Sequence, residues 1–260
     1  MHNNEKNINQ LINIYVRDGE RVDNLQISGL RLIQNPNQFC FGVDATLLAY
    51  YASLSIKPGA EVLDLCSGNG IIPILLTAKC GAARIVGLEI QKDVAEMAER
   101  SVRLNSLEDK VDILCGDLKD GTEIFKRSSF DNITCNPPYK ERGSGQINET
   151  DSTAIARHEI LCDLEDIISV SAALLRPGGK LTMIHRPDRL IDLCCLMRKY
   201  KLEPKKLRFV HPSYNKTATM ILVEAARGGR PKLFLDPPLY IYDEKGNYTD
   251  EIDKIYAKEV

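Results

Sequence analysis

Four consecutive residues, Asn136, Pro137, Pro138 and Tyr139, have the side chains needed to hold a planar amino group. The Asn136 side-chain oxygen and the Pro137 carbonyl can accept the two N–H groups of an amine and stabilise positive charge developing on its nitrogen. Two prolines in a row stiffen the backbone and fix the carbonyl direction. The Tyr139 ring can stack on the planar group and exclude water. The tetrad is therefore a candidate site for a planar amine that acts as a nucleophile, and its four residues are the candidate catalytic set.

A glycine-rich turn, 66–70 (Cys-Ser-Gly-Asn-Gly), follows an apolar run and precedes a helical stretch. Glycine at positions 68 and 70 lets the backbone approach a ligand where a Cβ would collide. Asp64, next to the turn, is placed to accept a hydrogen bond from a cationic amine. A dinucleotide fingerprint requires a small residue at position 73, where this chain has Pro73. The turn therefore predicts a binding loop for a ligand without a pyrophosphate.

Two further acidic residues stand where later apolar runs end. Glu89, followed by Ile90, can accept both hydroxyls of a ribose, and Asp117 precedes Leu118 after the next run. Open parallel sheets bind ligands at the carboxyl ends of their strands. The sequence therefore predicts that these residues meet the glycine-rich turn at one edge of a sheet.

The elements that must position these residues follow from alternating apolar runs and amphipathic stretches. Strands are expected at 61–65, 84–90, 111–114, 130–135, 180–185, 206–210 and 219–225, and helices at 43–53, 70–79, 92–104, 120–125, 164–175 and 186–199. Such alternation is typical of an α/β fold with helices on both faces of a parallel sheet. The last two runs form a hairpin, so one strand is antiparallel. The expected fold is a seven-stranded, mostly parallel sheet.

Three regions are expected along the chain. Residues 1–42 form an N-terminal extension with a frayed start and a short hairpin at 21–34, residues 43–226 form the ligand-binding domain, and residues 227–260 form a C-terminal arm. Asp44 is predicted to cap the helix at 43–53. Pro177-Gly178-Gly179 predicts a sharp stop between a helix and the next strand.

Bulk composition excludes several classes of protein. No apolar run approaches the length of a membrane span, and the polar N-terminus lacks the apolar core of a signal peptide. The eight cysteines include no C-x-x-C pair and fit free thiols in a reducing cytoplasm. No histidine–carboxylate cluster has metal-ligand spacing, so no metal is expected. Net charge is −2, so nucleic-acid binding would need a local patch. One basic stretch is either a solvated face or a phosphate-binding patch: Arg198, Lys199, Lys205, Lys206 and Arg208.

These motifs resemble those of known enzymes. The segment 64–70 resembles the first motif of class I S-adenosylmethionine-dependent methyltransferases, and the tetrad at 136–139 resembles the N-P-P-Y motif of those that methylate planar amines. Segments 41–48, 202–211 and 238–242 resemble the bacterial adenine-N6 methyltransferases that modify valine tRNA next to the anticodon. The resemblance implies a Rossmann-like fold, S-adenosyl-L-methionine as cofactor and an RNA substrate, most simply tRNA, for a monomer or weak dimer. The cofactor-binding residues that it implies are Asp44, Asp64, Cys66, Ser67, Gly68, Asn69, Gly70, Glu89, Ile90, Asp117, Leu118 and Asn136.

Other functions remain open at this stage. Protein glutamine-N5 methyltransferases share the tetrad, although they carry a larger N-terminal domain than residues 1–40 provide. A DNA adenine methyltransferase would need a target-recognition segment that this length barely permits. A non-catalytic RNA-binding protein would not need Asp64, Glu89 and the tetrad, and a nicotinamide oxidoreductase is disfavoured by Pro73. The polar segment 140–152 and His158 are expected to border the substrate entrance.

Overall fold

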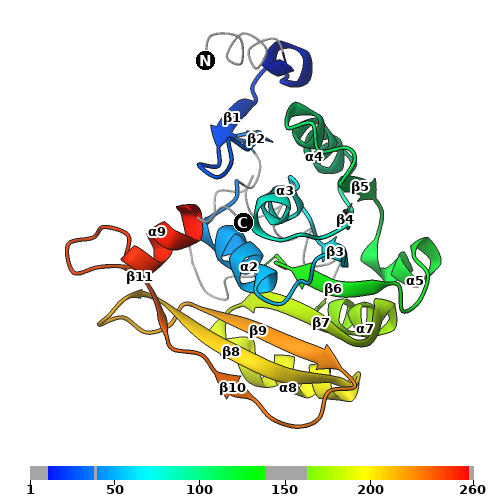
Figure 1. Ribbon diagram of the computed structural model, residues 1–260, viewed down its shortest axis with the longest axis vertical. Coiled ribbons are helices and arrows are strands. Elements are labelled where there is room, and N and C mark those ends of the chain that lie inside the picture. Colours follow the sequence, from blue (N-terminus) through cyan, green and yellow to red (C-terminus); the bar gives the residue numbers. More distant parts are fainter. Residues whose placement is uncertain (1–10, 38–39, 139–162, 258–260) are drawn as a thin grey trace.

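A mixed β-sheet forms the centre of the computed structural model, which describes residues 11–37, 40–138 and 163–257 (Figure 1). Within these residues the sheet has nine strands in the order β10-β8-β9-β7-β6-β3-β4-β5, with β11 also paired to β8. The strands are β3 (Glu61–Leu65), β4 (Arg84–Glu89), β5 (Val111–Cys115), β6 (Phe130–Cys135), β7 (Leu175–His185), β8 (Leu202–Ser213), β9 (Met220–Arg227), β10 (Phe234–Leu235) and β11 (Leu239–Tyr242). Strand β9 runs antiparallel to both β7 and β8, and the other pairs are parallel. The predicted seven-stranded, mostly parallel sheet is confirmed, and two short strands extend it.

Helices cover both faces of this sheet, as expected for parallel strands linked by crossovers. They are α2 (Val43–Ser53), α3 (Ile71–Lys79), α4 (Lys92–Leu104), α5 (Gly121–Ile124), α7 (Leu164–Leu174), α8 (Leu190–Lys199) and α9 (Asp250–Ala257), with short 3₁₀ turns at Leu118–Asp120 and Pro187–Arg189. Successive side chains of a strand point to opposite faces of the sheet, so each strand contributes side chains to two hydrophobic cores. Val62 packs in the core with α2, α3 and α9, whereas Leu63 packs in the core with α7 and α8. None of the described helices is long and apolar enough to cross a bilayer.

Residues 11–20, the described half of the predicted frayed start, are more ordered than expected, whereas the first ten residues lie outside the described residues. Residues 11–15 are helical and pack, through Leu11 and Tyr15, against Ile33 and α4. The predicted hairpin is confirmed as β1 (Arg21–Asn24) paired antiparallel with β2 (Arg31–Gln34). Apolar burial therefore orders this extension, although its polar composition predicts fraying.

The C-terminal arm joins the main fold. Strands β10 and β11 lie parallel to β8, and Ile252 and Ile255 of α9 are fully buried in the core shared with α2. Arg208 of β8, 9% exposed, binds both carboxylate oxygens of Glu251 at 2.8 and 2.9 Å. Burial holds α9 against α2, and the ion pair ties α9 to β8.

Two local predictions were wrong. Pro177-Gly178-Gly179 lies inside β7 as an irregularity, because Phe130 pairs with Leu175 whereas Asn132 pairs with Lys180. Gly178 takes a positive φ of 79°, which lets the strand accommodate the extra residues. Asp44 does not cap α2: the N-cap is Gly42, with no side-chain cap bond.

Candidate functional site

The glycine-rich turn and the start of the tetrad lie side by side at the carboxyl edge of the sheet. Strands β3 and β6 are parallel neighbours, with Leu65 paired to Cys135. Cys66 and Asn136 therefore leave the sheet together, one toward α3 and the other into the two prolines. This register brings the two motifs to the same edge of the sheet.

Positive φ angles shape the turn. Cys66, Gly68 and Gly70 have φ of 57°, 55° and 81°, and Gly70 is the N-cap of α3. A Cβ on Gly70 would stand 3.1 Å from the Cβ of Ala98, whereas a Cβ on Gly68 would meet nothing within 4 Å. Glycine at 70 therefore allows close packing on α4, and glycine at 68 borders open space that a ligand can use.

Glu89 supports this turn directly. Its Oε2 accepts a hydrogen bond from the Gly68 backbone N–H at 2.9 Å, and its Oε1 accepts one from the Gln91 N–H at 2.9 Å. The side chain is 4% exposed. Oε1 also accepts a longer hydrogen bond from Gln91 Nε2 at 3.4 Å, whereas Oε2, with one donor, keeps capacity for a hydroxyl. The predicted ribose contact is compatible with this geometry.

Asp64 is a fully buried acid beneath the turn. Its Oδ1 accepts a 2.6 Å hydrogen bond from Thr134 Oγ1, which pairs with it across β6. Burial, with a smaller contribution from nearby Glu89, raises the pKa of Asp64 to about 7, and the Thr134 bond opposes that rise. The nearby Ser67 hydroxyl also lowers the pKa of Asp64, but neither Asp64 Oδ2 nor Ser67 Oγ, both buried, has a partner within hydrogen-bond distance among the described residues. Two unsatisfied acceptors facing a ligand loop fit a cationic amine.

Asp44 contacts the tetrad instead of its own helix terminus. Asp44 Oδ2, in the first turn of α2, accepts a 2.8 Å hydrogen bond from Asn136 Nδ2. The Asn136 side chain is half-buried, Pro137 is buried and Pro138 is half-buried. Asp44 therefore binds the nitrogen of the Asn136 side-chain amide, and the oxygen of the same amide is the proposed acceptor for the target amine.

Two residues of the site were missed by sequence reasoning. Gln34 of β2, 1% exposed, accepts hydrogen bonds from Asn69 Nδ2 at 3.2 Å and from the Phe41 N–H at 3.1 Å. A Cβ on Gly87 of β4 would stand 2.5 Å from Ser67 Oγ, so glycine there makes room for the turn. The glycine inside the apolar run 84–90 was a usable signal for close backbone approach, whereas nothing local marks Gln34.

The third acid lies at the end of β5. Asp117 Oδ1 accepts a 2.9 Å hydrogen bond from the Lys119 N–H and so caps the turn that begins at buried Leu118. The Gly116 N–H bonds the Glu89 carbonyl at 2.9 Å, which ties this segment to β4. Ile90, half-buried, follows β4 beside them. These strand ends lie in the predicted order along the edge.

His185 completes the described edge at the end of β7. It is 8% exposed, and burial lowers its pKa to about 4. The imidazole is therefore neutral near pH 7 and adds no positive charge next to the amine site. Among the described residues, no group of three His, Cys, Asp or Glu side chains is arranged to hold a metal ion. Tyr139, the segment 140–152 and His158 lie outside the described residues.

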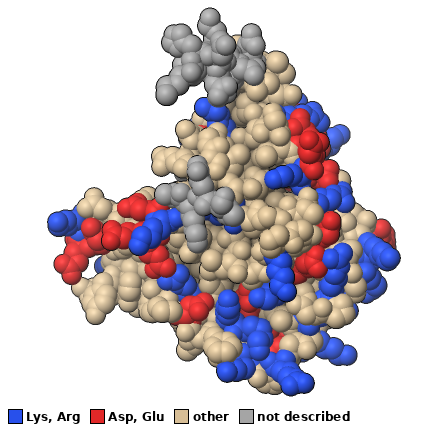
Figure 2. Space-filling view, in the orientation of Figure 1, with Lys and Arg blue, Asp and Glu red and all other residues tan. Residues whose placement is uncertain are grey.

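Arg198 and Lys199, at the start of the basic stretch, do not come to this edge. Strand β8 runs in the same direction as β7, and its first residue, Leu202, pairs with Arg227 at the amino edge of the sheet. Arg198 and Lys199, just before β8, therefore lie at the edge opposite Asn136, and Figure 2 shows basic side chains gathered over this end. Arg198 pairs with Glu203 at 2.7 Å and Lys199 pairs with Glu165.

The other basic residues of this stretch also have local roles. Lys205 donates to the Arg230 carbonyl at 2.8 Å, Arg208 is buried against Glu251, and half-buried Lys206 pairs in register with Glu224. The five residues therefore form no single patch beside the tetrad: Arg198 and Lys199 lie at the opposite edge, whereas Arg208, one residue before Phe209, lies nearer the carboxyl edge but is buried against Glu251. The direction of β8, which periodicity does not reveal, decides at which edge the charges lie.

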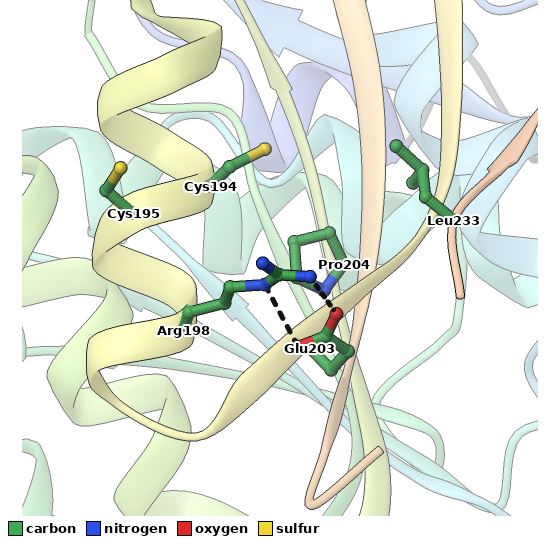
Figure 3. Close-up of a pocket in the computed structure, with 6 residues that line it drawn as sticks. All are labelled: Cys194, Cys195, Arg198, Glu203, Pro204 and Leu233. Carbon is green, nitrogen blue, oxygen red and sulfur yellow. Dashed lines mark hydrogen bonds and ion pairs between the residues drawn. The ribbon is translucent and has the colours of Figure 1, made fainter. Parts of the chain in front are cut away.

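A pocket of about 260 Å³ opens at that opposite edge (Figure 3). It lies between α8 and the start of β8 and is lined by Cys194, Cys195, Arg198, Glu203, Pro204 and Leu233. The Arg198–Glu203 ion pair crosses it. None of the predicted cofactor or catalytic residues lines this pocket, so it is separate from the strand-end site.

Comparison with known protein families agrees with the geometry. A model of the methyltransferase small domain family matches residues 29–192. A tRNA1(Val) (adenine(37)-N6)-methyltransferase of Porphyromonas gingivalis is 30% identical over 190 residues, which are 70% of this chain and 72% of the relative. An enzyme of the same name from Aeromonas hydrophila is 25% identical over 72% of this chain and 76% of its own length.

Solved structures share the fold. A predicted O-methyltransferase from Agrobacterium tumefaciens superimposes with a TM-score of 0.65 at 21% identity, over 84% of this chain and all of that one. The TYW2 protein of M. jannaschii, solved in complex with AdoMet, gives a TM-score of 0.55 at 12% identity, over 81% of this chain and 86% of that one. These structures therefore share the arrangement of strands and helices with this chain.

Proposed function

The chain belongs to the methyltransferase small domain family and is an S-adenosyl-L-methionine-dependent methyltransferase, and from this premise we propose that it methylates the exocyclic N6 amine of an adenine in tRNA next to the anticodon. The observation that carries the proposal is the hydrogen bond from Asn136 to Asp44 beside the glycine-rich turn. That bond prepares an amide acceptor at the strand end next to the cofactor loop. The relatives' names supply the class of amine and the RNA.

The cofactor is held by the glycine-rich turn and the acids around it. We assign Asp64 and Ser67 to its cationic amine, because both have buried unsatisfied oxygens. Glu89 accepts from the ribose hydroxyls while it anchors Gly68, and Asp117 with Leu118 borders the base. When bound, the cofactor supplies an electrophilic methyl group on a sulfonium sulfur.

Asn136 and the prolines prepare the nucleophile. The amine of adenine is a poor nucleophile because its lone pair is delocalised into the ring. When the Asn136 side-chain oxygen and the Pro137 carbonyl accept its two N–H groups, the lone pair localises on nitrogen and the positive charge that develops there is stabilised. The amine becomes acidic only as it is alkylated, so these acceptors suffice without a strong base.

Asp44 selects the orientation of that acceptor. An asparagine amide has one end that donates and one that accepts, and the wrong orientation would present N–H groups to an amine that also donates. With Nδ2 bonded to Asp44, the oxygen occupies the other end of the amide. We infer that Asp44 is a positioning residue for Asn136 and not a direct cofactor ligand.

A protein glutamine amide is the second candidate substrate, because its planar nitrogen suits the same acceptors. The adenine substrate is favoured by the two relatives, whose similarity extends over 70% and 72% of this chain. A non-catalytic role would leave no reason for Asp44 to orient Asn136. We place the enzyme in the cytoplasm, where tRNA is found, as a monomer or weak dimer.

Incubation with labelled S-adenosyl-L-methionine and total tRNA, followed by nucleoside digestion and mass spectrometry, tests the proposal. N6-methyladenosine is the expected product, and the Asn136→Ala variant is the control that should form almost none. A label found instead on glutamine of a protein substrate, or on another nucleoside, would replace the proposed substrate.

A further inference from the structure

Three aromatic side chains form a cluster at the carboxyl edge of the sheet, near the end of β8 and on β11. His211 and Tyr240 are register partners on these strands, with ring centroids 5.3 Å apart. Tyr214, in the turn between β8 and β9, lies 5.6 Å from Tyr240. Tyr214 is 71% exposed, which is unusual for a large aromatic residue, and the packing of the fold does not require its ring. We call His211, Tyr214 and Tyr240 the aromatic cluster.

The rings of this cluster keep their faces available. The planes of His211 and Tyr214 are tilted by 43° and 49° relative to Tyr240, so they do not cover one another. In contrast, Tyr248 stacks between Tyr242 and Tyr256 at 13° and 16°, which uses the faces of that trio internally. The aromatic cluster is therefore the better platform for an added planar group.

Backbone contacts hold the His211 ring and the turn that carries Tyr214 in place without a ligand. His211 Nδ1 lies 2.8 Å from the Lys216 carbonyl, and the Lys216 N–H bonds the Ser213 carbonyl at 3.1 Å. The Thr219 N–H bonds the Val210 carbonyl at 2.9 Å and closes the turn. A prearranged surface loses less conformational entropy on binding than a flexible one.

Local charge favours an anionic partner. Lys216 is the one fully charged residue between positions 211 and 219. The neighbouring segment around β11 and α9, in contrast, carries acidic and basic side chains together at the left of Figure 2. Asp243 and Glu244 follow β11, on which Tyr240 lies, so the lysine is on the Tyr214 side of the cluster. There, aromatic faces beside a lysine suit bases on a phosphate backbone.

The cluster lies on the same edge as the amine site. His185, at the end of β7, pairs with Ile221 of β9, and Ile221 pairs with Phe209 of β8 two residues before His211. Three strand spacings separate β6 from β8, which is about 14 Å across the sheet. A single-stranded segment of a few nucleotides can therefore reach both Asn136 and Tyr214.

We propose that the aromatic cluster stacks on an unpaired base flanking the target adenine and so binds the single-stranded loop of the RNA substrate. This inference rests on the proposed RNA methylation and adds the surface that holds the loop. Because Tyr214 is so exposed, its removal should leave the fold and the cofactor site unchanged.

Binding of a labelled RNA hairpin with an adenine-containing loop, measured by fluorescence anisotropy, tests the cluster. Tyr214→Ala should raise the Kd about 5- to 100-fold, and Tyr214→Trp should keep it near the wild-type value because stacking needs only a ring. Phe234→Ala is the matched control, since Phe234 is 49% exposed on β10 with Lys232 over its ring, and its Kd should not change. Cofactor titrations and thermal melts should be equal for all four proteins.

The outcomes separate this inference from the proposed function. An enzyme that methylates RNA normally and whose Kd and KM are unchanged in Tyr214→Ala would refute the cluster and leave the function standing. A wild type that binds the loop through Tyr214 but methylates no RNA would support the cluster and refute the reaction. A wild type that binds no RNA refutes both. A change in oligomeric state in Tyr214→Ala, without a change in Kd, would assign the rings to a second copy of the chain.

Discussion

Asn136 donates from Nδ2 to Asp44 Oδ2 at 2.8 Å, across 92 positions of sequence. This bond joins the first turn of α2 to the residue that follows β6. It fixes which end of the amide is the acceptor before any substrate arrives, and such preorganised dipoles account for much of enzymatic electrostatic catalysis. The chemistry of the tetrad therefore depends on a residue outside it.

Asp44→Asn should slow methyl transfer about tenfold or more, because an amide at position 44 can bond either end of Asn136 and no longer fixes its orientation. Cofactor affinity should stay within about twofold of the wild type. Single-turnover rates and calorimetric Kd values check the two effects separately. A large loss of cofactor affinity with an unchanged rate would show that Asp44 binds the cofactor directly.

Cofactor affinity should depend on the protonation of Asp64. Burial raises the pKa of this residue to about 7. The cationic amine favours the carboxylate, so protonation below this pKa opposes binding. The Kd should rise by up to about tenfold per pH unit as pH falls below 7. Calorimetry between about pH 5.5 and about pH 8.5 measures this slope. A flat Kd in wild type across this range would remove Asp64 from the cofactor site.

Asp64→Asn should stabilise the fold at alkaline pH. The folded pKa, about 7, lies above the ordinary value of 3.8, so the folded state retains the proton longer. The stabilising contribution is present below the unfolded pKa and is lost as pH rises through about 7. At about pH 8 the substitution should add on the order of 2–4 kcal/mol to the free energy of unfolding, and near pH 4 almost nothing. Denaturant unfolding at both pH values decides; a gain that is independent of pH would mean that charge burial is not the cause.

Gly87→Ala should weaken cofactor binding although residue 87 lies in a strand. Its Cβ would stand 2.5 Å from Ser67 Oγ and 2.8 Å from Ile113 Cδ1, so the turn must shift. Overpacking of this kind costs about 1–3 kcal/mol of stability. Gly59→Ala is the matched control, because residue 59 precedes β3 away from the turn, and its Cβ has open space and meets mainly the strain of a positive φ, about 1–2 kcal/mol. Thermal melts and cofactor titrations compare the two variants, and equal losses of affinity would exclude displacement of Ser67 as the cause.

The strand-end site was largely predictable from sequence because its parts are local. Apolar runs fixed where β3 and β6 end, and in a parallel sheet those ends must share an edge. The helices at 43–53 and 92–104 were predicted with the bounds observed for α2 and α4. Periodicity also placed the glycine turn and the prolines at the start of loops.

Contacts between distant segments were not predictable. Nothing near Gln34 indicates that it binds Asn69, and the acid at 44 has the local signature of a helix cap. Strands β10 and β11 are too short, and too close to prolines, for an alternating pattern to emerge. The position of the basic stretch depends on the direction of β8 in the sheet, which is a property of topology.

Single-turnover methylation of saturating tRNA by wild type and Asn136→Ala, with the cofactor Kd measured on the same preparations, tests the central claim most directly. Asn136 contacts the amine chiefly as charge develops, so its loss should fall on the chemical step. The account predicts a rate about 10²–10³-fold lower, with a nearly unchanged Kd and N6-methyladenosine as the wild-type product. Formation of N6-methyladenosine by Asn136→Ala at the wild-type rate would contradict it.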